Sequence, residues 1–122
     1  MSHQIIQPEG WAPAKGYANG VLSADGHLFV GGQIGWTAEQ KFECHDFIGQ
    51  MKQALQNIRD VVEAAGGTMA DIIKMNVYLV AEVDTSEVPK FRAVRDRYVN
   101  VEKPPASTLV VVTRLARPGW LI

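Results

Sequence analysis

The chain has 122 residues, of which 47% are hydrophobic and 20% charged, and its net charge is −1. This length predicts one domain, residues 1–122. The balanced charge without a basic stripe argues against nucleic acid as a partner, and no apolar run is long enough to span a membrane. A single cysteine and a start unlike a signal peptide predict a cytoplasmic protein.

Residues 17–33 are predicted to form a β-hairpin. The expected arms are residues 17–23 and 27–33, and Asp25-Gly26 between them is a turn signal. The second arm ends in Gly31-Gly32. Paired glycines weaken a strand, so they indicate a bulge or a close approach of another backbone segment.

The clearest helix is expected within residues 46–67. Its apolar residues recur with the spacing of one helix face, and they are Phe47, Ile48, Met51, Ala54, Leu55, Ile58, Val61, Val62 and Ala65. Gly66-Gly67 is a typical helix end. The apolar stripe needs a partner surface, and a sheet is the simplest one.

The second half of the chain is predicted to alternate strands and helices. Residues 71–80 indicate a strand with Ile73, Met75, Val77 and Leu79 on one face. Residues 86–99 indicate a helix with Ser86 as N-cap. Residues 106–115 show almost no polar alternation, which favours a central strand covered on both faces. Residues 119–122 would begin a last strand.

The expected element order is therefore β-β-α-β-α-β-β. This order predicts an α/β sandwich with one mixed sheet and both helices on one face. The other sheet face would be apolar and exposed, which implies a partner surface. A symmetric homo-oligomer supplies that surface without a second domain.

Few residues in the chain point to chemistry by themselves. Glu43, Cys44, His45 and Asp46 are contiguous, so they cannot all face one metal ion, and they precede a strong helix. Helix capping is the favoured interpretation over a metal site or a nucleophilic cysteine. The sequence contains no nucleotide-binding loop and no serine-hydrolase motif.

Two arginines on the second expected helix have two interpretations. Arg92 and Arg95 lie between apolar positions, and the simpler interpretation is a pair of solvated side chains with packed stems. Arg92 lies one turn after Val88, so it could also reach a cleft and hold a carboxylate with two parallel hydrogen bonds. For Arg114, which ends a buried strand, a structural role is favoured.

The sequence resembles the YjgF/RidA (Rid) family of enamine and imine deaminases over nearly its whole length. The segments that carry the resemblance are "WAPAKGYANGV", "LFVGGQIG", "QALQNIRDVVEAAGGTMADIIKMNVYL" and "PPASTLVVVTRLARPGWLI". The resemblance implies a chorismate-mutase-like α/β fold. It also implies a homotrimer whose sheets form a central barrel, with small-molecule clefts between subunits.

The positions that match the family's site differ from the deaminases. Their arginine on the penultimate strand, which holds the substrate carboxylate, corresponds to Ser107. The family's serine or threonine on the second strand corresponds to Gly31, and the cysteine two residues after the arginine to Leu109. The helix asparagine falls near Arg92, and the family's late glutamate would fall just beyond Ile122. Tyr17 matches the family's tyrosine.

The resemblance leaves two main functional hypotheses. The first is a specialised hydrolytic deaminase of a larger enamine or imine, such as an aminomuconate, because Gly31 and Ser107 are small and Leu109 is apolar. Ser107 and Tyr17 would then be catalytic, Arg92, Gly31, Gly32 and Leu109 would bind the substrate, and no metal or organic cofactor is expected. The second is a non-catalytic trimer that binds a small metabolite in the same clefts. Other hydrolytic or lyase chemistry in those clefts stays open.

Overall fold

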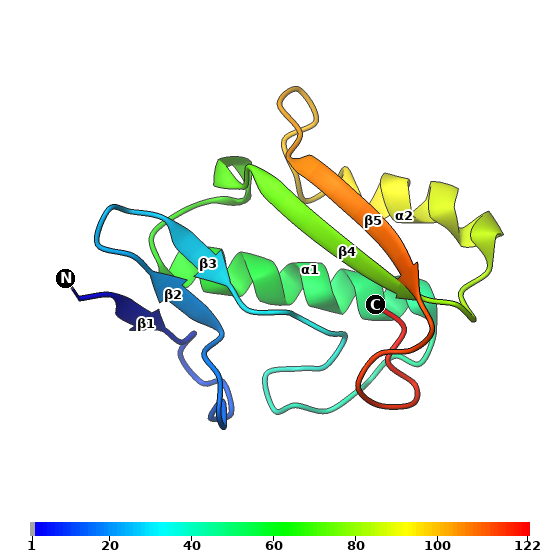
Figure 1. The fold of residues 1–122 in the computed structure, drawn as a ribbon, viewed down its shortest axis with the longest axis horizontal. Coiled ribbons are helices and arrows are strands. Elements are labelled where there is room, and N and C mark those ends of the chain that lie inside the picture. The colour runs from blue at the N-terminus through cyan, green and yellow to red at the C-terminus, as the bar shows by residue number, and fades with distance from the viewer. Residues whose placement is uncertain (1) are drawn as a thin grey trace.

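The computed structural model describes residues 2–122, which form two β-sheets with two α-helices on one side of them (Figure 1). The elements in chain order are β1 (Gln4–Ile6), β2 (Gly20–Leu22), β3 (Leu28–Val30), α1 (Phe47–Ala64), β4 (Lys74–Val80), α2 (Val88–Arg95) and β5 (Ala106–Val112). Short 3-10 turns at Met69–Asp71 and Thr85–Glu87 precede β4 and α2. Neither α-helix has the length and apolarity needed to cross a membrane, within residues 2–122.

The first sheet confirms the predicted hairpin and adds one strand to it. The backbone N–H of Ser23 donates to the carbonyl of His27 at 2.8 Å, and Gly26 adopts a positive φ of 93° in the turn. The paired arms are shorter than expected. The added strand is β1, which pairs antiparallel with β2 and which the sequence analysis did not predict.

The second sheet contains two parallel strands, β4 and β5. The prediction of one mixed sheet was therefore wrong. The expected last strand at residues 119–122 is also absent from the described structure, and that segment makes one backbone contact with β4, from the N–H of Val80 to the carbonyl of Leu121 at 3.2 Å. A single hydrogen bond does not make a ladder, so this segment adds no strand to β4.

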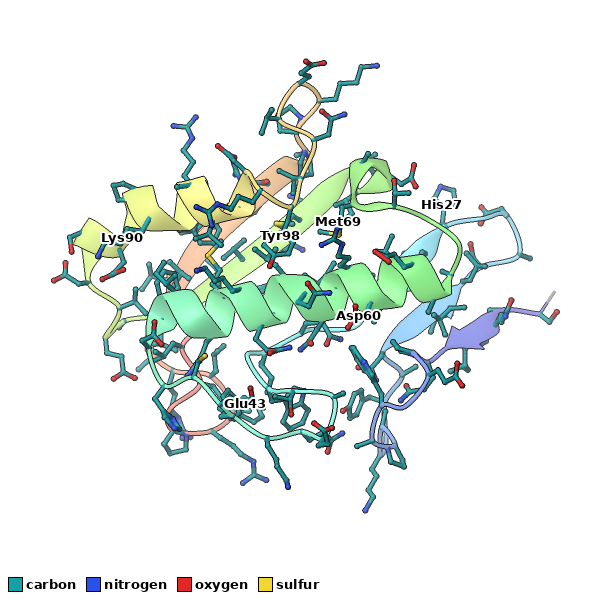
Figure 2. All side chains as sticks on the ribbon, turned by 180° about the vertical axis from the view of Figure 1, so that it is seen from behind. His27, Glu43, Asp60, Met69, Lys90 and Tyr98 are labelled. Atoms are coloured by element: carbon teal, nitrogen blue, oxygen red, sulfur yellow. The ribbon has the colours of Figure 1, made fainter. Side chains whose placement is uncertain are left out.

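The strand β5 is an edge strand and not the covered central strand that the sequence indicated. Six of its seven residues are exposed and the last is half-buried. The cause is the position of α2, which covers β4 but leaves the helix-facing side chains of β5 accessible. In Figure 2, which shows the helix side, Lys90 and Tyr98 lie at opposite ends of α2, in front of the sheet.

The helix α1 forms as predicted, and its ends explain its length. The carboxylate of Asp46 accepts from the N–H of Gly49 at 3.0 Å, which confirms the capping interpretation. At the other end, Gly66 has a positive φ of 90° and donates to the carbonyl of Glu63, while Gly67 donates to that of Val62. These two bonds are the pattern of a Schellman C-cap.

The core lies between the two helices and the second sheet. Its buried members are Phe47, Met51, Leu55, Met75, Val77, Leu79, Phe91, Val94 and Val99. Two predicted details were wrong. Ile73 precedes β4 and is exposed. Ser86 lies in a 3-10 turn and donates its backbone N–H to Asp84, so it is not the N-cap of α2.

The side of the sheets without helices carries exposed apolar residues, as expected. In β4, Tyr78 alternates with the buried Val77 and Leu79, and its register partner is Val110 of β5. In β3, Val30 is on the helix side, because its register partner Gly20 faces Val61 of α1. Phe29, the neighbouring residue in β3, is therefore on the opposite side. Tyr78, Val110 and Phe29 are all exposed. This set is called the helix-free apolar face below.

Candidate functional site

A groove between α2 and β5 contains two of the predicted site residues. It encloses about 470 Å³ and is lined by Val88, Pro89, Phe91, Arg92, Arg95 and Leu109. Leu109 reaches the groove because its register partner is Val77, whose side chain faces the helices. The structure therefore brings together Arg92 and Leu109, which the sequence analysis assigned to substrate binding.

The polarity of the groove changes along its length. The chain passes from β4 through α2 to the parallel strand β5, so α2 runs back along the sheet (Figure 1). Val88 and Pro89 consequently lie at the end where β5 finishes, and Arg95 lies at the end where β5 begins. The groove thus has two apolar residues at one end and two guanidinium groups toward the other.

The two arginines of the groove differ in their partners. Arg92 is exposed, and no ion pair of it occurs within residues 2–122. Arg95 is four-fifths buried, and its Nη2 donates to the carboxylate of Asp96 at 3.3 Å. The Nε of Arg95 is fully buried and has no hydrogen-bond partner in the described part of the chain. Sequence spacing marked Arg95 as an ordinary solvated side chain and gave no signal of this burial.

Ser107 lies near the guanidinium end of the groove without lining it. It is two residues before Leu109 on the same strand face, and its register partner Met75 faces the core. Its hydroxyl donates to the carbonyl of Pro105 at 3.1 Å. A hydroxyl used in this way keeps only acceptor capacity for a ligand, unless it rotates.

Tyr17, Gly31 and Gly32 form a second group beside the first sheet. The N–H of Gly31 donates to the carbonyl of Asn19 at 2.7 Å, so Gly31 lies against the segment that follows Tyr17. A Cβ at Gly31 would stand 2.7 Å from the carbonyl oxygen of Ala18, which confirms the predicted close backbone approach. Gly32 has free space around it. The hydroxyl of Tyr17 accepts from the side chain of Gln40 at 3.5 Å.

Within one subunit, the predicted site residues thus fall into two groups. Arg92, Leu109 and Ser107 belong to α2 and β5, and Tyr17, Gly31 and Gly32 belong to the region of the first sheet. Within residues 2–122, the two sheets share no hydrogen-bonded strands.

A second cavity, of about 490 Å³, has the opposite electrostatic character. It is lined by Asp46, Phe47, Ile48, Glu82, Val83, Asp84, Glu87, Lys90 and Leu121. Four of these residues are acidic and one is basic, so the cavity disfavours an anionic ligand. It also contains none of the predicted site residues, and the groove between α2 and β5 is the better candidate.

The remaining titratable clusters lie away from the groove. Hydrogen bonds from Ser23 and His27 lower the pKa of Asp25 to about 2, and this group forms the hairpin turn. Hydrogen bonds from Ser86 lower the pKa of Asp84. Glu43 lies on the loop across α1 from α2 (Figure 2), and no cluster of three or more potential metal ligands occurs within residues 2–122.

Comparison with known proteins identifies the class to which this fold and groove belong. The family model described as endoribonuclease L-PSP matches residues 8–122. The chain therefore belongs to this family, which is the YjgF/RidA family. Among relatives, a RutC family protein of Saccharolobus solfataricus is 33% identical over 122 residues, covering 96% of this chain and 90% of that protein. Protein HMF1 of Saccharomyces cerevisiae is 28% identical over 107 residues, covering 88% and 80%.

Solved structures agree with this assignment over nearly the whole chain. RidA from an Antarctic Psychrobacter matches with a TM-score of 0.81 and 29% identity, covering 97% of this chain and 92% of that one. YyfA of Yersinia pestis, a Rid family protein described as of unknown function, matches with a TM-score of 0.84 at 24% identity, covering 98% and 93%. The fold is thus the α+β, chorismate-mutase-like fold of the Rid family.

Proposed function

We propose that this chain is a hydrolytic deaminase of an enamine or imine that carries a carboxylate. The observation that supports this most directly is the groove between α2 and β5, which joins the guanidinium of Arg92 to the apolar surface of Leu109. The Rid family includes enamine and imine deaminases. Arg92 would replace the cation that Ser107 does not provide, because a carboxylate in a partly buried site needs a fixed charge.

The proposed reaction needs only water and proton transfers. Water adds to the imine carbon, the C=N bond becomes a C–N bond, and a proton reaches the nitrogen. Ammonia then leaves as the carbonyl forms, so an imino acid and water yield an oxo acid and ammonia. The protein would accelerate the reaction by positioning the reactants. Arg92 would hold the carboxylate, and Tyr17 and Ser107 would position water and substrate.

The separation of the predicted site residues supports a cleft between subunits. Tyr17 and the Gly31-Gly32 pair lie beside the first sheet, and Arg92 and Ser107 lie on α2 and β5. In a homotrimer, as the family resemblance implies, one subunit would contribute the first group and its neighbour the second. The small side chain at position 107 would leave room for a substrate larger than 2-iminopropionate, whereas the space at Gly31 is filled by the carbonyl of Ala18.

The first prediction concerns activity. We expect the purified protein to release ammonia from an aminomuconate and to be slow on iminopropionate generated in the same assay. Arg92→Ala should lower kcat/KM by tenfold or more, since it removes the hydrogen bonds of a charged group worth about 1.5–3 kcal/mol. Arg97→Ala is the control, because Arg97 is exposed and lies outside the groove.

Ser107→Arg extends the same experiment. If the site is otherwise competent, this variant gains activity on iminopropionate, because it restores a cation at the strand position. No turnover of either substrate by the parent and by Ser107→Arg would contradict the deaminase proposal. That result would favour the second candidate, a non-catalytic trimer that binds a small metabolite in the same groove, which the loss of the strand arginine also supports.

The activity that the family's name suggests, endoribonuclease, receives no support from the charge of this chain. The net charge is −1, and twelve basic residues are balanced by thirteen acidic ones. Binding of RNA depends largely on phosphate contacts from clustered lysine and arginine. The groove carries two arginines, which suit one carboxylate better than a phosphate backbone.

A further inference from the structure

We infer that Arg95 is a carboxylate-binding residue of the groove, and that Asp96 occupies half of its hydrogen-bonding edge in the free protein. The inference rests on the proposed function in one respect, since it concerns the same groove. It assigns the carboxylate to Arg95 and Arg92 together, and not to Arg92 alone. It also assigns the ligand's orientation.

The geometry of the Arg95 side chain is the first support. Nε and Nη2 form one edge of a guanidinium, and a carboxylate can accept from both at once. Here Asp96 accepts from Nη2 alone, at 3.3 Å, which is a long contact for a charged pair. Nε is buried and unpaired within residues 2–122. A buried donor without an acceptor is unfavourable. Because Nε has no accessible surface, a carboxylate accepts from both atoms only after the Arg95 side chain shifts to uncover Nε, and the two hydrogen bonds gained favour that shift.

The position of the two arginines is the second support. Arg92 and Arg95 are three residues apart on α2, so their side chains emerge from the same helix face. Both line the cavity of about 470 Å³. Lys90, the neighbouring cation on this helix, is already paired with Glu87 at 3.4 Å. Arg92 and Arg95 carry two positive charges, and Asp96 neutralises one of them. One positive charge is therefore available to a ligand.

The apolar lining gives the orientation of the ligand. Val88 and Pro89 lie toward the far end of the groove from Arg95, and Leu109 and Phe91 complete its apolar surface. A ligand with one carboxylate and a hydrocarbon tail therefore fits with the carboxylate at Arg95 and the tail toward Val88.

The test is a binding titration of the full chain with 4-methyl-2-oxopentanoate, a stable oxo acid with a branched tail. The matched control ligand is 4-methyl-2-pentanone, which keeps the tail and the ketone but lacks the carboxylate. Binding is followed by calorimetry and by the Nε–H NMR signal of Arg95, assigned from its loss in Arg95→Lys. We expect saturable binding of the acid, a downfield shift of that signal, and no saturable binding of the ketone.

Three variants separate this inference from a merely structural role of Arg95. Arg95→Lys keeps the charge but lacks the paired donors, and should weaken binding about tenfold, as for the loss of one hydrogen bond to a charged group. Asp96→Asn should tighten binding about two- to fivefold, because an exposed ion pair no longer competes. Arg97→Ala should bind like the parent. A structural role predicts no gain from Asp96→Asn.

The outcomes distinguish this inference from the deaminase proposal. Acid binding that depends on Arg95, without turnover of any imine, would support the inference and contradict the proposed reaction. Turnover that is unaffected by Arg95→Lys would support the reaction and overturn the inference. Equal binding of acid and ketone, no binding of the acid, or unchanged affinity in Arg95→Lys would each overturn it as well.

Discussion

Gln50 is a buried polar residue in the first turn of α1, and it holds the C-terminal segment. It is 1% exposed. Its Nε2 donates to the carbonyls of Gly119 at 2.9 Å and Cys44 at 3.3 Å, and its Oε1 accepts from the N–H of Leu121 at 2.9 Å. One side chain thus satisfies three backbone groups of two loops.

We expect Gln50→Ala to lower the free energy of unfolding by about 3 kcal/mol, since it leaves buried backbone groups unpaired and creates a cavity. Urea unfolding followed by circular dichroism measures the change. Gln56→Ala is the matched control on the same helix, because the half-buried side chain of Gln56 bonds only to Asp60 within residues 2–122, and its loss should cost less than about 0.5 kcal/mol. Equal effects of the two variants would contradict the role of Gln50.

The ends of α1 show how an element is specified locally. Asp46 supplies one hydrogen bond to the first turn, and Glu43 and His45 beside it are exposed. Asp46→Ala should therefore destabilise the protein by about 1 kcal/mol, whereas Asp46→Ser should retain most of the stability. Thermal unfolding compares the two, with Glu43→Ala as a neutral control. A larger loss for Glu43→Ala than for Asp46→Ala would show that capping is not the role of this segment.

The elements that the sequence predicts correctly are those with local causes. The hairpin follows from Asp25-Gly26, and α1 follows from its apolar spacing and its terminal glycines. The wrong expectations depend on long-range pairing. The exposure of β5 follows from where α2 lies, and the expected last strand is missing because residues 119–122 bond mainly to the side chain of Gln50.

The candidate site was predicted in part. The resemblance to the Rid family pointed to Ser107, Leu109 and Arg92, and the register with β4 explains why Leu109 faces the groove. Arg95 was interpreted as a solvated side chain, because the burial of its Nε depends on packing around α2, which no spacing rule reports. Gly31 was identified as a close approach, but its partner, the carbonyl of Ala18, became known only from the structure.

At the scale of the whole molecule, the helix-free apolar face indicates a surface that binds another protein subunit. Tyr78 is 50% exposed and Phe29 64% exposed, on the side that neither helix covers. Stable association of subunits usually needs a surface of this apolar kind. The homotrimer expected from the family resemblance would bury it and would also join the two groups of predicted site residues.

Sedimentation analysis tests this expectation. The parent should sediment as a trimer, and Tyr78→Glu should dissociate it, because a carboxylate would be buried without a partner. Val101→Glu is the control, since Val101 is similarly exposed but lies in the loop between α2 and β5. A parent that is monomeric at micromolar concentration, or a trimer unaffected by Tyr78→Glu, would contradict a trimer built on this face.

The contacts of Gln50 also set an order for folding. The hydrogen bond between its side chain and Leu121 joins residues 71 positions apart, whereas the β2–β3 hairpin closes within a few residues. Closing a long loop has a larger entropic cost than closing a short one, and the cost is recovered only when the contact forms. The hairpin and α1 can thus form early, while the chain is still being synthesised. Residues 119–122 then dock onto a helix that already exists, so these contacts form only after that segment has been synthesised.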